Sequence, residues 1–147
     1  MSPALDRARA DLSAAELLVG AGFAPQAVAC AFRASRHAAD AALLAIGETR
    51  STDAATVGAF VQRVVRQRGL DPKAGQLLRS LHNRALLANL SYDPVPPDEA
   101  GAAVRDATAV VDAVEAWLEE PVRTANGHVT RRAAPVPPKE RPARRRR

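Results

Sequence analysis

The sequence is poor in the residues on which several classes of protein depend. It has one cysteine, Cys30, in 147 residues, which excludes an intramolecular disulfide framework and a multi-cysteine zinc site. Aromatic residues make up only 3% of the chain, whereas sheet proteins normally contain more aromatic and β-branched side chains. No uncharged apolar run reaches the roughly 20 residues of a membrane-spanning helix, and the charged first turn does not resemble a signal peptide. We therefore expect a soluble, cytoplasmic protein with no membrane association.

The sequence also lacks the common signatures of an enzyme active site. It has no glycine-rich phosphate-binding loop, no nucleophile elbow and no histidine spacing suited to a metal ion. We therefore expect neither a metal nor a cofactor. An enzyme of this kind would need metal-free chemistry, and RNA cleavage qualifies because the RNA 2′-hydroxyl supplies the nucleophile.

Alanine and regularly spaced apolar residues are what the sequence has in abundance. Hydrophobic residues make up 47% of the chain, and alanine favours helix because it loses no side-chain entropy there. Apolar residues recur at spacings of three and four, which indicates helices with one buried face. Short connections imply mostly antiparallel packing. The sequence predicts an all-α, up-and-down bundle of about five helices. The first begins at Pro3 and stops at Gly20 and Gly22, the second runs from Pro25 to about Ile46, and the third ends before Gly69. The fourth begins at Pro72 and ends near the break over residues 91–97, where the fifth begins.

Capping residues and glycines mark the ends of these predicted helices. Ser2-Pro3 and Asp71-Pro72 each combine an N-cap residue with a proline at the first helical position. Ser51 or Thr52 is suited to cap the third helix. Glycines follow the first three helices, at Gly20, Gly22, Gly47 and Gly69.

The net charge of +5 is unevenly distributed along the chain. Residues 121–147 contain nine Lys and Arg against one acid, which gives +8, whereas residues 1–120 contain twelve basic and fifteen acidic groups, which gives −3. The tail is rich in Pro, Ala and Arg without periodicity, so it is expected to be disordered. We therefore divide the chain into a helical domain over residues 1–120 and a disordered basic tail over residues 121–147.

Two polar clusters near the end of the fourth predicted helix are the best candidates for a site. Arg84 precedes an apolar run, and Asn89 and Tyr92 follow it. In a functional interpretation Arg84 binds phosphate with the help of the other two. In the competing interpretation Arg84 pairs with an acid, Asn89 caps the helix and Tyr92 packs at the edge, because most arginines serve on solvated faces.

The histidines and the basic residues are open to two interpretations as well. His37 and His82 are candidate acid–base groups or hydrogen-bonded core residues. Residues 54–92 have a net charge of +5, which is compatible with a surface that binds the phosphate backbone or with a solvated helical face. The candidate nucleic-acid-binding residues are Arg63, Arg66, Lys73, Arg79, Arg141, Arg144, Arg145, Arg146 and Arg147.

Three parts of the chain combine apolar and polar residues in a recognisable order. They are residues 8–22, residues 27–47 with Phe32-Arg33-Ala34 and His37-Ala38-Ala39, and Phe60-Val61 followed by Leu78, Arg84 and Tyr92-Asp93. In this order they resemble the first helix, the second helix and the remainder of the domain of the HEPN family (higher eukaryotes and prokaryotes nucleotide-binding). The resemblance covers residues 4–120.

The resemblance implies a helical bundle that is usually a homodimer and is often paired with a minimal nucleotidyltransferase. It also implies that many members are metal-independent ribonucleases, frequently toxins, with a site made of an arginine, a histidine four to six residues later and in some a nearby tyrosine. Arg84 matches the arginine, but the residue five positions later is Asn89, and no histidine lies between Arg84 and Tyr92. The chain therefore resembles subgroups without that histidine.

Two functions remain open from the sequence. One is a metal-independent ribonuclease toxin, paired with a nucleotidyltransferase-type antitoxin, that uses Arg84, Asn89 and Tyr92, with His82 or His37 as an acid–base group. The other is a non-catalytic module that binds RNA or another nucleic acid, or regulates a nucleotidyltransferase-type partner. In a further variant the basic tail alone contacts nucleic acid, with steep salt dependence.

Overall fold

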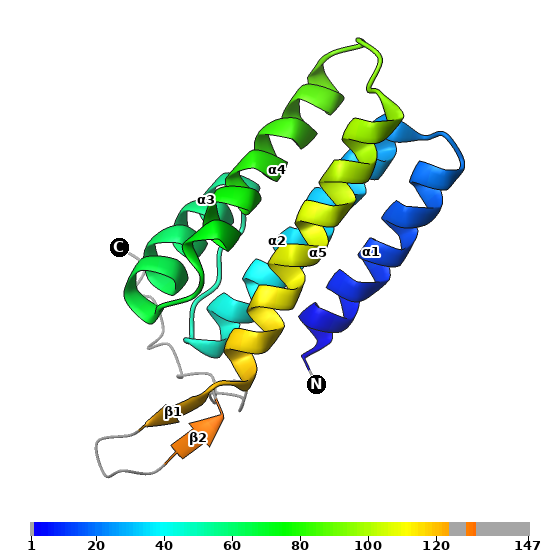
Figure 1. The fold of residues 1–147 in the computed structure, drawn as a ribbon. Coiled ribbons are helices and arrows are strands. Elements are labelled where there is room, and N and C mark those ends of the chain that lie inside the picture. The colour runs from blue at the N-terminus through cyan, green and yellow to red at the C-terminus, as the bar shows by residue number, and fades with distance from the viewer. Residues whose placement is uncertain (1, 124–128, 132–147) are drawn as a thin grey trace, which may run out of the picture.

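The computed structural model describes residues 2–123 and 129–131, and it confirms the predicted all-α bundle (Figure 1). Helices α1 (Pro3–Gly20), α2 (Ala24–Ala45), α4 (Pro72–Leu90) and α5 (Pro97–Glu119) alternate in direction. The short helix α3 (Asp53–Ala59) continues directly into a π-helix, η1 (Phe60–Arg66), beside α4. The helices begin and end near the predicted start and stop residues, except in the third segment.

Helix α2 is the centre of the bundle and packs against α1, α4 and α5. Thirteen of its 22 residues are buried, and those that are not, among them Arg33, Arg36 and Asp40, recur at helical spacing on one remaining face. Most of the buried residues are alanines, which leave room for neighbouring helices to approach closely. The alanines of α2 with no exposed surface are Ala27, Ala31, Ala34, Ala38, Ala39 and Ala42.

The helix ends follow the capping pattern with one exception. The Thr52 side chain accepts a hydrogen bond from the Ala55 amide at 3.2 Å, and the Asp71 side chain accepts one from the Lys73 amide at 3.0 Å. Ser2 occupies the N-cap position of α1, but its side chain makes no capping bond. Here the proline at the first helical position, which has no amide hydrogen to satisfy, suffices to begin the helix.

The third segment is not the uniform α-helix that its spacing predicts. From Phe60 the backbone widens into the π-helix η1, in which amides bond to carbonyls five residues earlier. The wider turn places Phe60, Val64 and Val65 together on the inner side, where all three are buried. Val64 and Val65 follow Phe60 by four and five residues, and these spacings suit the wider turn of a π-helix.

Beyond α5 the structure describes two three-residue strands, β1 (Pro121–Arg123) and β2 (Val129–Arg131). They pair antiparallel, with Val122 opposite Thr130. Their β-branched residues favour this extended form, which the sequence analysis did not predict. The rest of the tail assigned to residues 121–147 lies outside the described residues.

The glycine at position 75 sets the separation of α4 and η1. A Cβ atom added there would lie 3.3 Å from a Val65 methyl and 3.4 Å from a Val61 methyl, whereas one added at Gly58 would meet nothing within 4 Å. We predict that Gly75→Leu lowers the free energy of unfolding by about 1–3 kcal/mol through overpacking. Gly58→Leu, the matched control, should be neutral or stabilising because glycine is a poor helix former. Urea denaturation of both variants tests this, and equal effects would contradict it.

Candidate nucleic-acid interface

Arg84 connects α4 to α5. Its Nη2 donates to Asp106 Oδ2 at 2.8 Å, and its Nε donates to the Ser80 carbonyl at 3.4 Å. Only 20% of the Arg84 side chain is exposed, compared with 35% of Asp106. The sequence interpretation in which Arg84 pairs with an acid therefore describes this geometry. The sequence feature that could have revealed this ion pair is Asp106, an acid next to the apolar positions of α5. The sequence alone did not assign Asp106 as the partner of Arg84.

A cleft of about 220 Å³ opens beside Arg84 at the turn between α4 and α5. Leu87 and Val95 supply apolar lining, while Asp93 and Glu99 supply carboxylates. These two acids and Asp106 oppose the approach of a phosphate to Arg84. Because the guanidinium already has a carboxylate partner, the cleft is poorly suited to bind an anion.

Asn89 and Tyr92 lie on the surface near the end of α4. Both are exposed, and Tyr92 is exposed over its whole side chain. In the described part of the chain neither makes a hydrogen bond to Arg84. Asn89 is not the capping residue either, since α4 ends at Leu90 with Ser91 as its C-cap. The structure therefore does not assemble these three predicted residues into one hydrogen-bonded site.

The two candidate histidines lie in separate places. The ring of His82 on α4 stacks on that of Phe32 on α2, with centroids 5.0 Å apart and an interplanar angle of 27°. His37 lies instead between two carboxylates, with Nε2 3.5 Å from Asp11 Oδ2 and Nδ1 3.9 Å from Asp40 Oδ2. Neither histidine is an ion-pair or hydrogen-bond partner of Arg84 among the described residues.

The Asp11–His37–Asp40 cluster is a polar inclusion between α1 and α2 that sequence reasoning missed. Asp11 is buried on the inner face of α1 beside Leu12, and its Oδ2 has no hydrogen-bond partner. The Cys30 thiol donates to the Asp11 carbonyl at 3.2 Å, and burial raises the pKa of that thiol. The sequence feature that could have revealed this cluster is Asp11, an acid on the apolar face of the first helix.

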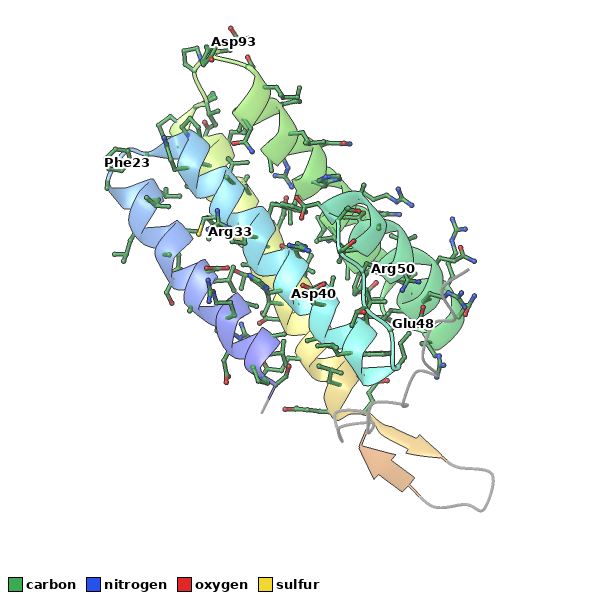
Figure 2. All side chains as sticks on the ribbon, turned by 180° about the vertical axis from the view of Figure 1, so that it is seen from behind. Phe23, Arg33, Asp40, Glu48, Arg50 and Asp93 are labelled. Carbon is green, nitrogen blue, oxygen red and sulfur yellow. The ribbon has the colours of Figure 1, made fainter. Side chains whose placement is uncertain are left out.

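Exposed cations gather where η1 turns into α4, and we call Arg63, Arg66, Arg68 and Lys73 the cationic turn. All four side chains are exposed. In Figure 2 nitrogen-bearing side chains project outward from this end of the bundle, close to Arg50. The carboxylates nearby are already engaged, because Glu48 pairs with Arg50 at 2.9 Å and Asp71 caps α4.

The cationic turn is held firmly by the core beneath it. Leu70 is buried at the centre of the turn, and Gly69 adopts a φ of +75° that favours glycine. The Trp117 indole Nε1 donates to the Arg68 carbonyl at 3.0 Å, which ties the turn to α5. Arg63 lies 3.7 Å from Glu48, and Arg66 contacts Gln62 at 3.3 Å, so both guanidinium groups keep donors free for other ligands.

The remaining predicted basic residues lie apart from this turn. Arg79 is exposed on the outward face of α4, six residues or about 9 Å of helix beyond Lys73. Arg141 and Arg144 to Arg147 lie outside the described residues, so their predicted role in binding nucleic acid stays a prediction.

Other kinds of site receive no support in the described part of the chain. No group of three or more His, Cys, Asp or Glu side chains there could hold a metal ion. None of its helices is long and apolar enough to cross a membrane. Comparison with known protein families finds no family whose model matches the chain, and comparison with curated proteins finds no matching relative.

We predict that Arg84→Ala lowers the free energy of unfolding by about 1–2 kcal/mol, because it leaves Asp106 half-buried without its charged partner. The corresponding fall in melting temperature is about 4–8 °C per kcal/mol in a small domain. Arg105→Ala, which removes an exposed arginine from α5, is the matched control and should be nearly neutral. Thermal unfolding followed by circular dichroism measures both, and an Arg84 variant as stable as the control would disprove the cross-link.

We also predict a pH-dependent effect of Asp40. Burial raises the pKa of its carboxyl above the ordinary 3.8, although Arg36 and His37 oppose the shift. A raised folded-state pKa stabilises the fold below the unfolded pKa, and that stabilisation is lost as the pH rises through the folded pKa. Asp40→Asn should therefore be more stable than wild type at pH 7, and the difference should shrink towards pH 4. Urea unfolding across this range, with exposed Glu16→Gln as control, tests the sign, and a less stable Asn variant at pH 7 would refute it.

Proposed function

We propose that this chain is an HEPN-like RNA-binding module that contacts RNA phosphates through the cationic turn. The observation that carries the proposal is the gathering of four exposed cations, from Arg63 to Lys73, on a turn fixed to the core by Trp117 and Leu70. Because the backbone of the turn is already held in place, only the side chains lose conformational freedom when they bind a phosphate backbone. The resemblance to HEPN domains is what favours RNA among the nucleic acids.

Binding is better supported than cleavage. A metal-free ribonuclease needs a group that transfers protons and a cation that stabilises the phosphorane. Here Arg84 is neutralised by Asp106, and acids line its cleft. Asn89 cannot transfer protons near neutral pH, and His82 stacks on Phe32. We therefore place the chain with non-catalytic modules, in which it would present RNA to a nucleotidyltransferase-type partner, as the resemblance implies.

The test compares two charge-reversed variants of the full-length chain. In both, Arg141 and Arg144 to Arg147 are replaced by Gln so that the tail does not dominate binding. One variant adds Arg66→Glu and Lys73→Glu, and the other adds Arg7→Glu and Arg33→Glu, which make the same change in net charge at exposed sites on α1 and α2. Fluorescence anisotropy with a short labelled RNA then measures affinity across a range of salt concentrations.

We expect the Arg66/Lys73 variant to lose most RNA affinity and the control to lose little. The slope of log affinity against log salt should flatten by about 0.7 for each lost phosphate contact on single-stranded RNA. Equal losses in both variants would refute the cationic turn as the binding surface. RNA that is cleaved during incubation, with cleavage abolished by Arg84→Ala but not by Arg105→Ala, would establish a ribonuclease instead.

A further inference from the structure

Large apolar side chains that are exposed gather at one end of the bundle. All but one of those in the described part of the chain lie in the last turns of α1 and α4 or in the segments that follow them, and Figure 1 and Figure 2 show these two helix ends at the same end of the molecule. They are Leu17, Phe23, Leu86, Leu87, Leu90 and Tyr92, while Leu44 lies at the other end of α2. Isolated exposed leucines are ordinary, but a group of this kind marks an interaction surface.

The leucines of α4 border the cleft between the end of α4 and the start of α5. Leu87 is 66% exposed and lines the cleft with Val95. Leu86 and Leu90 are separated from one another by one helical turn, so they form an apolar ridge beside the cleft. The cleft volume of about 220 Å³ is below the roughly 300–1,000 Å³ of most small-molecule sites. The cleft therefore suits a single apolar side chain of a larger partner that also covers the ridge.

This end of the bundle is acidic and contains no basic residue in either of its turns. Residues 14–28 contain one acid and residues 86–102 contain three, with no Lys or Arg in either range. These acids are Glu16, Asp93, Asp98 and Glu99, all exposed, and among the described residues none has an ion-pair partner. The nearest arginine, Arg84, is already paired with Asp106. The cations of the cationic turn lie at the opposite end, so the molecule has one basic end and one acidic, apolar end.

The charge of this end decides between its possible occupants. RNA and anionic lipids carry negative charge and are repelled by these acids. A second copy placed by a two-fold axis would bring the same acids against one another. The basic tail of this chain has the right charge, but residues 132–147 contain no Leu, Ile, Met or aromatic residue that could fill the cleft. A protein segment that carries Lys or Arg beside large apolar residues is complementary in both respects.

We propose that the end of α4 and the start of α5 dock a basic amphipathic helix of a partner protein. An apolar side chain of that helix enters the cleft against Leu87 and Val95, and its neighbours at helical spacing pack on the ridge of Leu86 and Leu90. Its cations pair with the acids of the rim, foremost Asp93 and Glu99. The apolar contact supplies most of the affinity, and the charges fix the orientation. The cationic turn lies at the other end of the bundle, so this inference does not rest on RNA binding.

The first experiment uses a fluorescein-labelled synthetic helical peptide of about five turns. Its leucines recur at spacings of three and four, and lysines flank them. One control peptide has glutamate in place of every lysine, and a second has the same composition in a scrambled order that removes the apolar face. Fluorescence anisotropy with the full-length chain measures the affinity of each. We expect the lysine peptide to bind and both controls to bind at least about tenfold more weakly.

Substitutions at exposed leucines locate the binding surface. Leu87→Glu should weaken binding of the lysine peptide by about tenfold or more, because it places a charge at the mouth of the cleft. Leu44→Glu, the matched control at the other end of α2, should leave the affinity unchanged. Circular dichroism shows whether each variant remains helical. Leu90→Glu, outside the cleft lining but on the ridge, gives a second reading should Leu87→Glu impair folding.

A charge exchange tests the role of the acids. Asp93→Lys with Glu99→Lys should weaken binding of the lysine peptide and make the chain bind the glutamate peptide instead. Asp6→Lys with Glu119→Lys makes the same change in net charge at exposed positions of α1 and α5 and should do neither. A change of preference in both double variants would reflect net charge alone and would refute a specific surface.

Other results would also overturn the proposal. These are equal binding of the scrambled peptide, equal effects of Leu87→Glu and Leu44→Glu, or no change of preference after the charge exchange. Light scattering that shows a self-association abolished by Leu87→Glu would assign this end to a second copy. RNA affinity should be the same in Leu87→Glu as in wild type, and its loss would assign this end to RNA. Weak RNA binding by all variants, with peptide binding intact, would refute the proposed function and leave this inference standing.

Discussion

The close approach of helices to the alanine surface of α2 is the constraint on which the rest of the structure depends. Six alanines along this helix have no exposed surface, and α1, α4 and α5 all pack against it. Small side chains reduce the apolar area that each residue can bury, so the bundle needs many close contacts in place of a few large ones. The large buried side chains, Trp117 and Phe60, are used where α5 and η1 close the bundle.

Polar groups within this tight bundle serve mainly to connect helices. Arg84 joins α4 to α5, Arg36 lies 3.1 Å from Asp53 of α3, and Arg9 on α1 contacts Asp112 at 2.8 Å and Glu115 at 2.5 Å. Hydrogen bonds to Glu115 and Asp112 raise the pKa of Arg9, so its guanidinium stays protonated. Since these arginines between helices are engaged in this way, the exposed cations and the exposed leucines lie at the margins of the bundle, and helix α4 carries some of both.

Helix α4 presents three different surfaces, because residues on different sides and at different ends of a helix face different surroundings. Its buried side, with Leu78 and Leu81, belongs to the core. Its first turn contributes Lys73 to the cationic turn, where Gly75 allows η1 to pack closely. Its last turns expose Leu86 and Leu90. The proposed phosphate-binding surface and the apolar surface thus occupy opposite ends of one helix, so a ligand at one end does not cover the other.

The sequence by itself determined the helices, because spacing, prolines and glycines act locally: Asp71 caps α4 and Gly47 ends α2 as expected. It also located the basic residues near Lys73 and the polar ones near Arg84. Only the tertiary structure decided that Arg84 faces Asp106, 22 residues away, and that His37 lies beside Asp11. It likewise decided that the third segment widens into a π-helix. These outcomes depend on which helix faces meet, and in an alanine-rich chain many faces look alike in sequence. Only the distances at which the helices pack in the folded protein distinguish one such face from another.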